Sequence, residues 1–72
     1  MDTQSLKIPL DRVAVLIGKE GEVKLRIEGV QDVRLTIDSE EGDVVISGEN
    51  SIAVYETIDI VKAIARGFHP AI

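Results

Sequence analysis

The chain has 72 residues, enough for one small domain, and its 44% hydrophobic and 29% charged residues are typical of a folded globular domain. The absence of cysteine excludes a disulfide framework, a cysteine nucleophile and a thiolate zinc site. The formal net charge of −5 falls entirely on residues 30–72, because residues 1–29 carry five bases and five acids, and residues 30–72 carry three bases and eight acids. An anionic ligand is therefore expected to bind the first half of the chain.

Composition disfavours further classes of site. One tyrosine and one phenylalanine are too few for an aromatic platform that stacks single-stranded bases. A single histidine leaves too few ligands for a transition-metal site. No apolar run approaches the roughly 20 residues of a membrane helix, and the first residues lack the basic and apolar segments of a signal peptide. We therefore expect a cytoplasmic protein with an aliphatic core and no membrane contact.

The chain begins with the pattern of a short strand and then a helix. Residues 5–8 alternate polar and apolar side chains and are stopped by Pro9, as in an edge strand. The apolar run over residues 12–17 suits either a buried strand or a buried helix. Pro9, with Asp11 as the N-cap, favours the helix.

A glycine-containing break at residues 18–21 separates this segment from a second short helix. Residues 22–28 carry acids first and bases later, the order that the helix dipole prefers. Gly29 is expected to end this helix, because glycine readily adopts the positive φ of a C-terminal cap.

A β-hairpin follows the two helices. Residues 32–38 alternate in the manner of a half-buried strand, and residues 44–47 form the returning strand after a turn at residues 39–43. The side chains expected to face the core from the first of these strands are Val33, Leu35 and Ile37.

Residues 51–66 form the longest periodic segment and predict a helix that begins at Asn50 or Ser51 as N-cap and ends at Gly67. The element order β-α-α-β-β-α predicts an α+β domain with three helices packed on one face of a three-stranded antiparallel sheet. The apolar stripe of the last helix consists of Val54, Tyr55, Ile58, Val61, Ile64 and Ala65.

Gly18 and Gly21 frame a short loop between the first two predicted helices. Two residues without Cβ atoms allow a phosphodiester backbone to lie close to the main chain. The loop leads into a helix N-terminus, whose N–H groups and dipole favour an anion, and Lys19 adds a positive charge. The alternative is structural, with the glycines serving as a helix C-cap and a tight turn.

The sequence Ile17-Gly18-Lys19-Glu20-Gly21, followed by Ile27, resembles the signature of the KH domain in the type I arrangement of eukaryotic and archaeal proteins. The resemblance covers nearly the whole chain. It implies a module that clamps about four nucleotides of single-stranded RNA, with the bases in an aliphatic groove.

The same resemblance implies which residues would contact RNA. The walls of the groove would come from the first helix, including Leu16, and from the second strand, and the sequence leaves open which of these side chains face the core instead. The RNA-binding residues implied are Val13, Ile17, Gly18, Lys19, Glu20, Gly21, Glu22, Lys24, Leu35 and Ile37.

Three features depart from the KH pattern, and the two that add negative charge are expected to weaken RNA binding, because like charges on protein and phosphate repel. Lys24 stands where KH domains usually have isoleucine or valine, and Glu20 places a negative charge in the loop. Lys24 and Arg26 are each open to two interpretations, a phosphate contact or a solvated helix face. The turn that flanks RNA in the family is acidic here, with Asp38, Glu40, Glu41 and Asp43.

Residues 8–12 and 16–24 resemble more narrowly the first KH domain of the small-subunit ribosome-assembly proteins that partner the Nob endonuclease, where a lysine at the position of Lys24 is usual. This implies binding to small-subunit ribosomal RNA near its 3′ end during maturation. The implied protein partners are the Nob endonuclease and the α subunit of translation initiation factor two. Residues 1–67 would then be a KH domain, and residues 68–72 a tail that leads to a second domain.

A protein-interaction module of KH-like fold, with little RNA affinity, is the alternative function, because the acidic second half would suit a basic protein. We do not expect an enzyme, since the sequence has no nucleophile–base pair, metal-ligand set or nucleotide-binding loop. His69 is expected to be a linker residue, and the acids around Gly42 lack the pattern of a calcium loop. Neither a cofactor nor a small-molecule substrate is expected.

Overall fold

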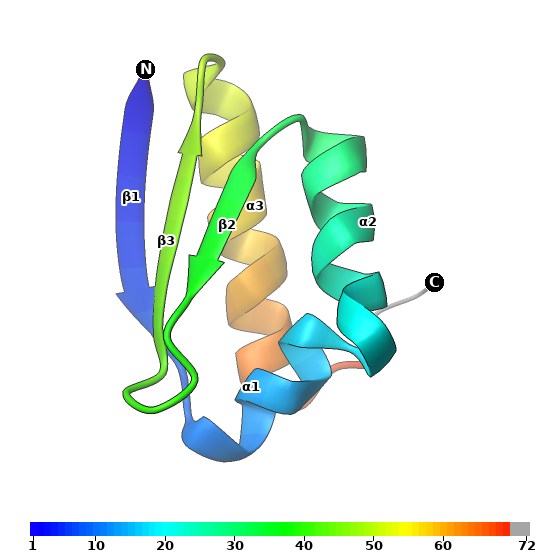
Figure 1. Cartoon of the computed structure of the whole chain (residues 1–72). Coiled ribbons are helices and arrows are strands. Elements are labelled where there is room, and N and C mark those ends of the chain that lie inside the picture. The colour runs from blue at the N-terminus through cyan, green and yellow to red at the C-terminus, as the bar shows by residue number, and fades with distance from the viewer. Residues whose placement is uncertain (70–72) are drawn as a thin grey trace.

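Seven elements follow one another along residues 1–69, the part of the chain that the computed structural model describes (Figure 1). Their order confirms the predicted β-α-α-β-β-α arrangement, and the apolar run after Pro9 is a helix. The elements are β1 (Asp2–Lys7), α1 (Leu10–Ile17), the 3₁₀ turn η1 (Lys19–Gly21), α2 (Glu22–Gln31), β2 (Arg34–Ile37), β3 (Asp43–Gly48) and α3 (Ser51–Ala65).

The sheet has β3 in its centre, paired antiparallel with β1 on one side and β2 on the other. Successive side chains alternate between the two faces of a sheet. One face is open and polar, and the helices cover the other, as Figure 1 shows for α3. The predicted α+β fold with a three-stranded antiparallel sheet is therefore confirmed. The rows on the covered face are Gln4–Ile46–Leu35 and Leu6–Val44–Ile37.

Side chains from the strands and all three helices meet in one aliphatic core. Thr57 is fully buried, and its hydroxyl donates to the carbonyl oxygen of Ala53 at 2.7 Å, so this polar group is satisfied. Tyr55 is 55% exposed, which corrects its placement in the buried stripe. The core residues are Ile8, Val13, Leu16, Val23, Ile27, Val33, Leu35, Val44, Ile46, Val54, Val61 and Ile64.

Two elements, β1 and α1, begin two or more residues earlier than the sequence predicts. β1 starts at Asp2 rather than at residue 5, because its first residues pair with the end of β3, Asp2 with Gly48. α1 starts at Leu10, directly after Pro9. Asp11 therefore lies in the first turn, where its charge complements the helix dipole, and is not the N-cap.

α2 continues through Gly29 to Gln31, so the prediction that Gly29 ends this helix is wrong. A Cβ atom at Gly29 would meet nothing, and the backbone there stays helical. Asp32 adopts the left-handed conformation with φ 54°, and its N–H donates to the carbonyl oxygen of Glu28. Aspartate tolerates this conformation better than most side chains, which explains why no glycine is needed at the helix end.

α3 is capped as the sequence predicts. The side-chain oxygen Oδ1 of Asn50 accepts from the N–H groups of Ile52 at 2.9 Å and Ala53 at 3.3 Å, so Asn50 is the N-cap. Gly67 follows the helix with φ 105°, a backbone conformation that favours glycine. None of the helices within residues 1–69 is long and apolar enough to cross a membrane.

The β2–β3 turn is fixed against the end of β1. Gly42 has φ 79°, and a Cβ atom there would overlap the carbonyl oxygen of Ile8. The N–H of Ile8 donates to the carbonyl oxygen of Gly42 at 2.9 Å. Only glycine allows this close approach, which places the acidic turn beside the start of α1 (Figure 1).

Candidate nucleic-acid interface

The loop at residues 18–21 depends on a glycine at its first position. Gly18 has φ 77° and ψ 173°, a combination that essentially only glycine adopts. A Cβ atom there would lie 2.5 Å from Cγ2 and 2.8 Å from the backbone nitrogen of Val23. The absence of a side chain at Gly18 therefore lets the end of α1 pack directly on the first turn of α2.

The remainder of the loop is a tight 3₁₀ turn with two further positive φ values, 56° at Glu20 and 78° at Gly21. The N–H of Gly21 donates to the carbonyl oxygen of Gly18 at 3.1 Å. A Cβ atom at Gly21 would meet nothing, so this glycine is needed for its conformation and leaves open space above the main chain. Lys19 and Glu20 are exposed at the tip of the loop.

The start of α2 is chemically suited to an anion. Its N-cap is Gly21, and no side chain makes a capping hydrogen bond there. The first N–H groups of a helix carry partial positive charge and need an acceptor from outside the helix. Glu22, in the first turn, is an exposed carboxylate that competes with a phosphate for this position. The loop therefore offers a phosphate two favourable groups, Lys19 and the N-terminus of α2, next to two unfavourable carboxylates, Glu20 and Glu22.

The structure separates core residues from surface residues among the predicted groove walls. Val13 and Leu35 are only 5% and 2% exposed, and Leu16 is fully buried, so these three side chains are part of the core. Ile17 and Ile37 are half-buried and keep part of their surface open. Of the residues predicted to form the walls of the groove, Ile17 on α1 and Ile37 on β2 therefore have side-chain surface that a ligand can contact.

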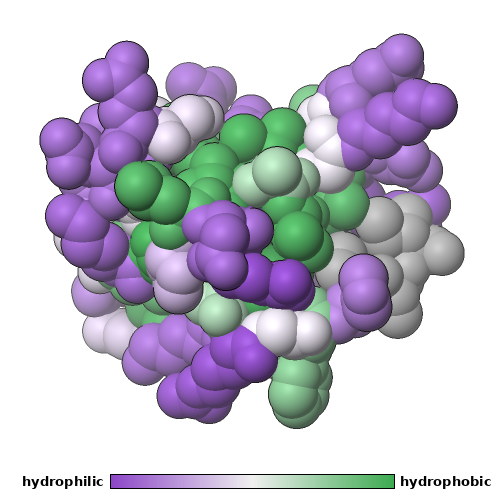
Figure 2. Space-filling model, turned by 90° about the horizontal axis from the view of Figure 1, so that it is seen from below, coloured by the Kyte–Doolittle hydropathy of each residue, from purple (hydrophilic) through white to green (hydrophobic). Residues whose placement is uncertain are grey.

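Sequence reasoning missed Leu10, which is 58% exposed at the start of α1. It lies seven residues before Ile17, and this helical spacing could have identified it as a residue on the same side of α1. Figure 2 shows the end of the molecule where α1 and the β2–β3 turn lie, and hydrophobic surface gathers there with hydrophilic side chains around and across it. This face can therefore bury apolar parts of a ligand between charged groups.

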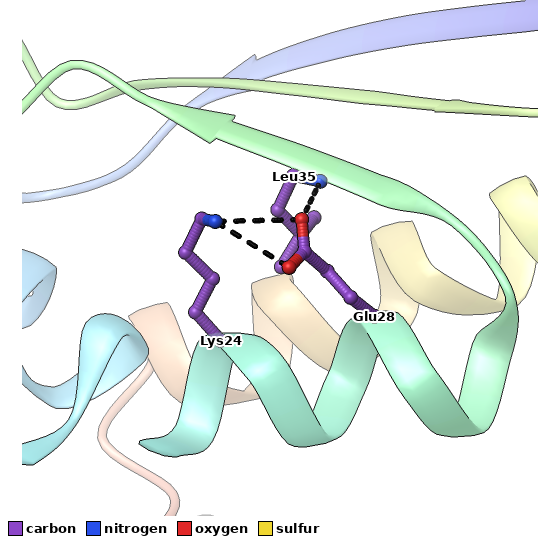
Figure 3. A network of polar contacts seen from close by, with 3 residues as sticks. All are labelled: Lys24, Glu28 and Leu35. Carbon is purple, nitrogen blue, oxygen red and sulfur yellow. Dashed lines mark hydrogen bonds and ion pairs between the residues drawn. The ribbon is translucent and has the colours of Figure 1, made fainter. Parts of the chain in front are cut away.

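Lys24 points from α2 toward β2 and is paired (Figure 3). Its Nζ lies 3.4 Å from both carboxylate oxygens of Glu28. The same carboxylate accepts from the N–H of Leu35 at 2.8 Å, so it ties α2 to the outer edge of β2. Lys24 is therefore already neutralised, and Lys19 and Arg26 remain as the exposed bases near the loop.

Among the hollows on the surface of residues 1–69, two border α2 and lie outside the predicted groove. One, of about 800 Å³, is a wide depression on the outer face of α2 that reaches Lys19 and Glu20 and is bordered by Leu25 and Arg26. The other, of about 330 Å³, lies between α2 and α3 and is lined mainly by apolar side chains, including Phe68. Neither hollow lies between α2 and β2.

The acidic turn is ordered by its own hydrogen bonds. Oδ1 of Asp38 accepts from the N–H groups of Glu40 at 2.9 Å and Glu41 at 3.2 Å, and both glutamates are exposed. Asp43 lies 3.6 Å from Nζ of Lys7 in an exposed ion pair. Within the described residues no group of three or more acidic or imidazole side chains is placed to hold a metal ion.

Comparison with known proteins identifies relatives over nearly the full chain. The KH domain-containing protein MJ0443 of Methanocaldococcus jannaschii is 52% identical in an alignment of 71 residues, and the match covers 93% of this chain and 31% of that protein. The crystal structure of Dim2p from Pyrococcus horikoshii matches with a TM-score of 0.94 and 47% identity, over 97% of this chain and 45% of the other. The chain thus spans less than half the length of these relatives.

Two further solved structures bear on the interface and the fold. A complex of a/eIF2α, aDim2p and rRNA from Pyrococcus horikoshii matches with a TM-score of 0.90 and 48% identity, over 96% of this chain and 41% of that chain. The thirteenth KH type I domain of human Vigilin matches with a TM-score of 0.66 at 18% identity, over 99% of this chain and 82% of the other, a likeness of fold alone. Residues 3–63 match the family described as "KH domain". The predicted family is confirmed, and the chain belongs to the KH domain family.

Proposed function

We propose that this chain is an RNA-binding module without catalytic activity, which holds a short single-stranded segment at the loop of residues 18–21. One observation carries the proposal. The contact of Gly18 with Val23 fixes the loop at the start of α2, where no side chain caps the helix. A phosphate can take the place of the missing cap, with Lys19 beside it. KH domains clamp the RNA backbone at a loop of this kind.

The target that we propose is small-subunit ribosomal RNA. The support comes from the relative that was crystallised with rRNA, to which this chain is 48% identical. The same complex contains a/eIF2α, and we therefore extend the proposal to a translation-factor or ribosome-assembly partner. Because the chain covers less than half of that relative, we propose that it supplies one of the RNA contacts of a longer protein.

The test is a titration with short single-stranded RNA oligomers, followed by amide NMR shifts and by fluorescence anisotropy. The double variant Lys19→Asp/Glu20→Asp removes the exposed base of the loop and is expected to weaken binding about tenfold or more, since it replaces a phosphate-binding cation with an anion. The wild-type shifts are expected at residues 17–24 and 33–37. The matched control is Lys62→Asp, which changes the net charge by the same two units at an exposed position of α3, outside both ranges.

Equal loss of affinity in the double variant and in Lys62→Asp would contradict the proposed site and indicate a general charge effect. No shifts with any oligomer at low salt would contradict RNA binding itself. The alternative of a protein-interaction module would then gain weight, with the exposed acids Glu40 and Glu41 of the ordered turn as its first candidates for contact with a basic protein.

A further inference from the structure

Exposed apolar side chains gather around Arg26 of α2, where the two hollows that border this helix meet. Val30 lines both hollows and is 74% exposed. Leu25 is exposed beside the wide depression, and Phe68, which follows α3, is 67% exposed beside the smaller hollow. Apolar side chains that are exposed together, rather than singly, mark a surface for interaction. We call the smaller hollow, which lies between α2 and α3, the α2–α3 groove.

The α2–α3 groove has a shape that suits a helix. α2 and α3 lie side by side (Figure 1), and the groove runs between them. The buried side chains of Ile27 and Ile64 form its floor, and the exposed side chains of Val30 and Phe68 form its margins. Amphipathic helices bind in such grooves, with apolar anchors at positions i, i+3 or i+4 and i+7. A third helix laid along the groove would therefore bury side chains that α2 and α3 leave exposed.

The charges along the groove differ from those of the protein as a whole. The chain has a formal net charge of −5, but no acidic side chain of residues 1–69 lines the groove. The titratable side chains that line it are Arg26 and His69. Arg26 is exposed and forms no ion pair in this part of the chain, not even with Glu22, one turn before it. A carboxylate is therefore the charged group that this surface complements.

These features favour a protein over a second stretch of RNA. Single-stranded RNA binds to a series of cations or stacks its bases on aromatic side chains. Among the described lining residues, Arg26 is the one permanent cation and Phe68 the one aromatic side chain, and the others are mainly aliphatic. A helix with large aliphatic anchors gains more from this lining, because the burial of its apolar side chains is itself favourable.

We propose that the α2–α3 groove binds an amphipathic helix of a partner protein, and that a carboxylate beside the apolar stripe of this helix pairs with Arg26. Large apolar side chains of the helix then fill the groove between Val30 and Phe68. None of residues 17–22 lines the groove, so the bound helix leaves the loop at residues 18–21 free for RNA. The proposal is therefore independent of RNA binding.

The probe for this surface is a pair of designed peptides of about 18 residues, which is long enough to form a helix. Both peptides contain the same numbers of leucine, alanine, glutamate and lysine residues and have zero net charge. One carries its glutamates beside the leucine stripe and its lysines on the far face, and the other has the two charges exchanged. Fluorescence anisotropy measures the affinity of each peptide for the 72-residue chain. The peptide with flanking glutamates is expected to bind about tenfold more tightly.

Variants of two exposed residues test the contacts. Val30→Glu is expected to lower the affinity for the favoured peptide about tenfold or more, because it places a carboxylate at the apolar margin and within reach of Arg26. The matched control is Ile52→Glu, the same kind of change at a helical position that is 69% exposed and does not line the groove. Arg26→Glu is expected to invert the preference between the two peptides, a result that loss of the fold cannot produce.

Amide NMR shifts locate the contact. The favoured peptide is expected to shift residues 26–31 and 60–68, also when an RNA oligomer is bound. The proposal is overturned if the two peptides bind equally or not at all, if Val30→Glu and Ile52→Glu have equal effects, or if the peptide shifts only residues 17–24. Shifts at 26–31 and 60–68 that are caused by RNA, or by a higher protein concentration without peptide, would assign the groove to RNA or to a second copy and would equally overturn it.

Discussion

At the scale of single residues, the two glycines of the loop have different reasons to be glycine. Gly18 has a backbone conformation that other residues essentially never adopt. In addition, a Cβ atom at this position would overlap the backbone nitrogen of Val23. Gly21 has a positive φ of 78°, and the space where a Cβ atom would lie is empty. The first glycine therefore holds the two helices together, and the second leaves room for a ligand.

This difference predicts unequal costs for the same substitution. Gly18→Ala is expected to lower the free energy of unfolding by about 3 kcal/mol, because backbone strain of about 1–3 kcal/mol adds to the overlap with Val23. Gly21→Ala is expected to cost only about 1 kcal/mol, the strain of the left-handed conformation alone. Urea denaturation of the two variants measures both values. Equal losses would show that the contact of Gly18 with Val23 relaxes without cost.

Charged residues show a comparable division of roles. Glu28 is bonded to the N–H of Leu35 and to Lys24, and this pair is partly shielded from solvent, with side-chain exposures of 19% and 31%. Lys24 contributes to the junction between α2 and β2. The sequence alone did not decide whether Lys24 contacts a phosphate or lies on a solvated helix face. This could not be predicted, because the partner N–H belongs to a strand whose position relative to α2 depends on the tertiary fold.

At the scale of elements, local patterns predicted the type and order of every helix and strand but not all of their ends. The alternation around Leu35 and the apolar stripe around Val61 are properties of a few neighbouring residues, and the structure confirms both except at Tyr55, which is exposed. The start of β1 depends on pairing with Gly48, far along the chain, and no local pattern reveals it. The end of α2 was misplaced because glycine is compatible with both a helix interior and a helix cap.

The position at which α2 ends can be tested by replacing a glycine with alanine at two sites, Gly29 and Gly67. Gly29 is helical and Gly67 has φ 105°, and a Cβ atom would meet nothing at either position. Gly29→Ala is expected to raise the free energy of unfolding by about 0.5–1 kcal/mol, since alanine is the better helix former. Gly67→Ala is expected to lower it by about 1 kcal/mol, because a positive φ strains alanine. A loss of stability in Gly29→Ala would indicate that α2 ends at Gly29 in solution.

At the scale of the whole molecule, the net charge and the loop of residues 18–21 act in opposite directions on an RNA ligand. The loop of residues 18–21 attracts phosphate locally, within a protein whose net charge of −5 repels it. The affinity for RNA is therefore expected to depend on ionic strength.

Because few positive charges contact the phosphates, we expect the affinity for RNA to depend only weakly on salt concentration. A phosphate at the start of α2 and one at Lys19 amount to one or two neutralised charges, because Lys24 is already paired with Glu28. Each phosphate contact with single-stranded nucleic acid contributes a slope of about −0.7 to the logarithm of affinity against the logarithm of salt concentration. The slope for this chain is therefore expected between about −0.7 and −1.4. Anisotropy titrations of one RNA oligomer over a series of salt concentrations measure it.

The variant Lys24→Met provides the internal control for that slope, because it removes a base that the structure places in an ion pair. The slope is expected to stay within error of the wild-type value. A clearly shallower slope in Lys24→Met, or a wild-type slope steeper than about −3, would mean that RNA draws Lys24 away from Glu28. In that case the α2–β2 junction would rearrange on binding, and the bond from Leu35 to Glu28 would be the first contact to examine in the bound state.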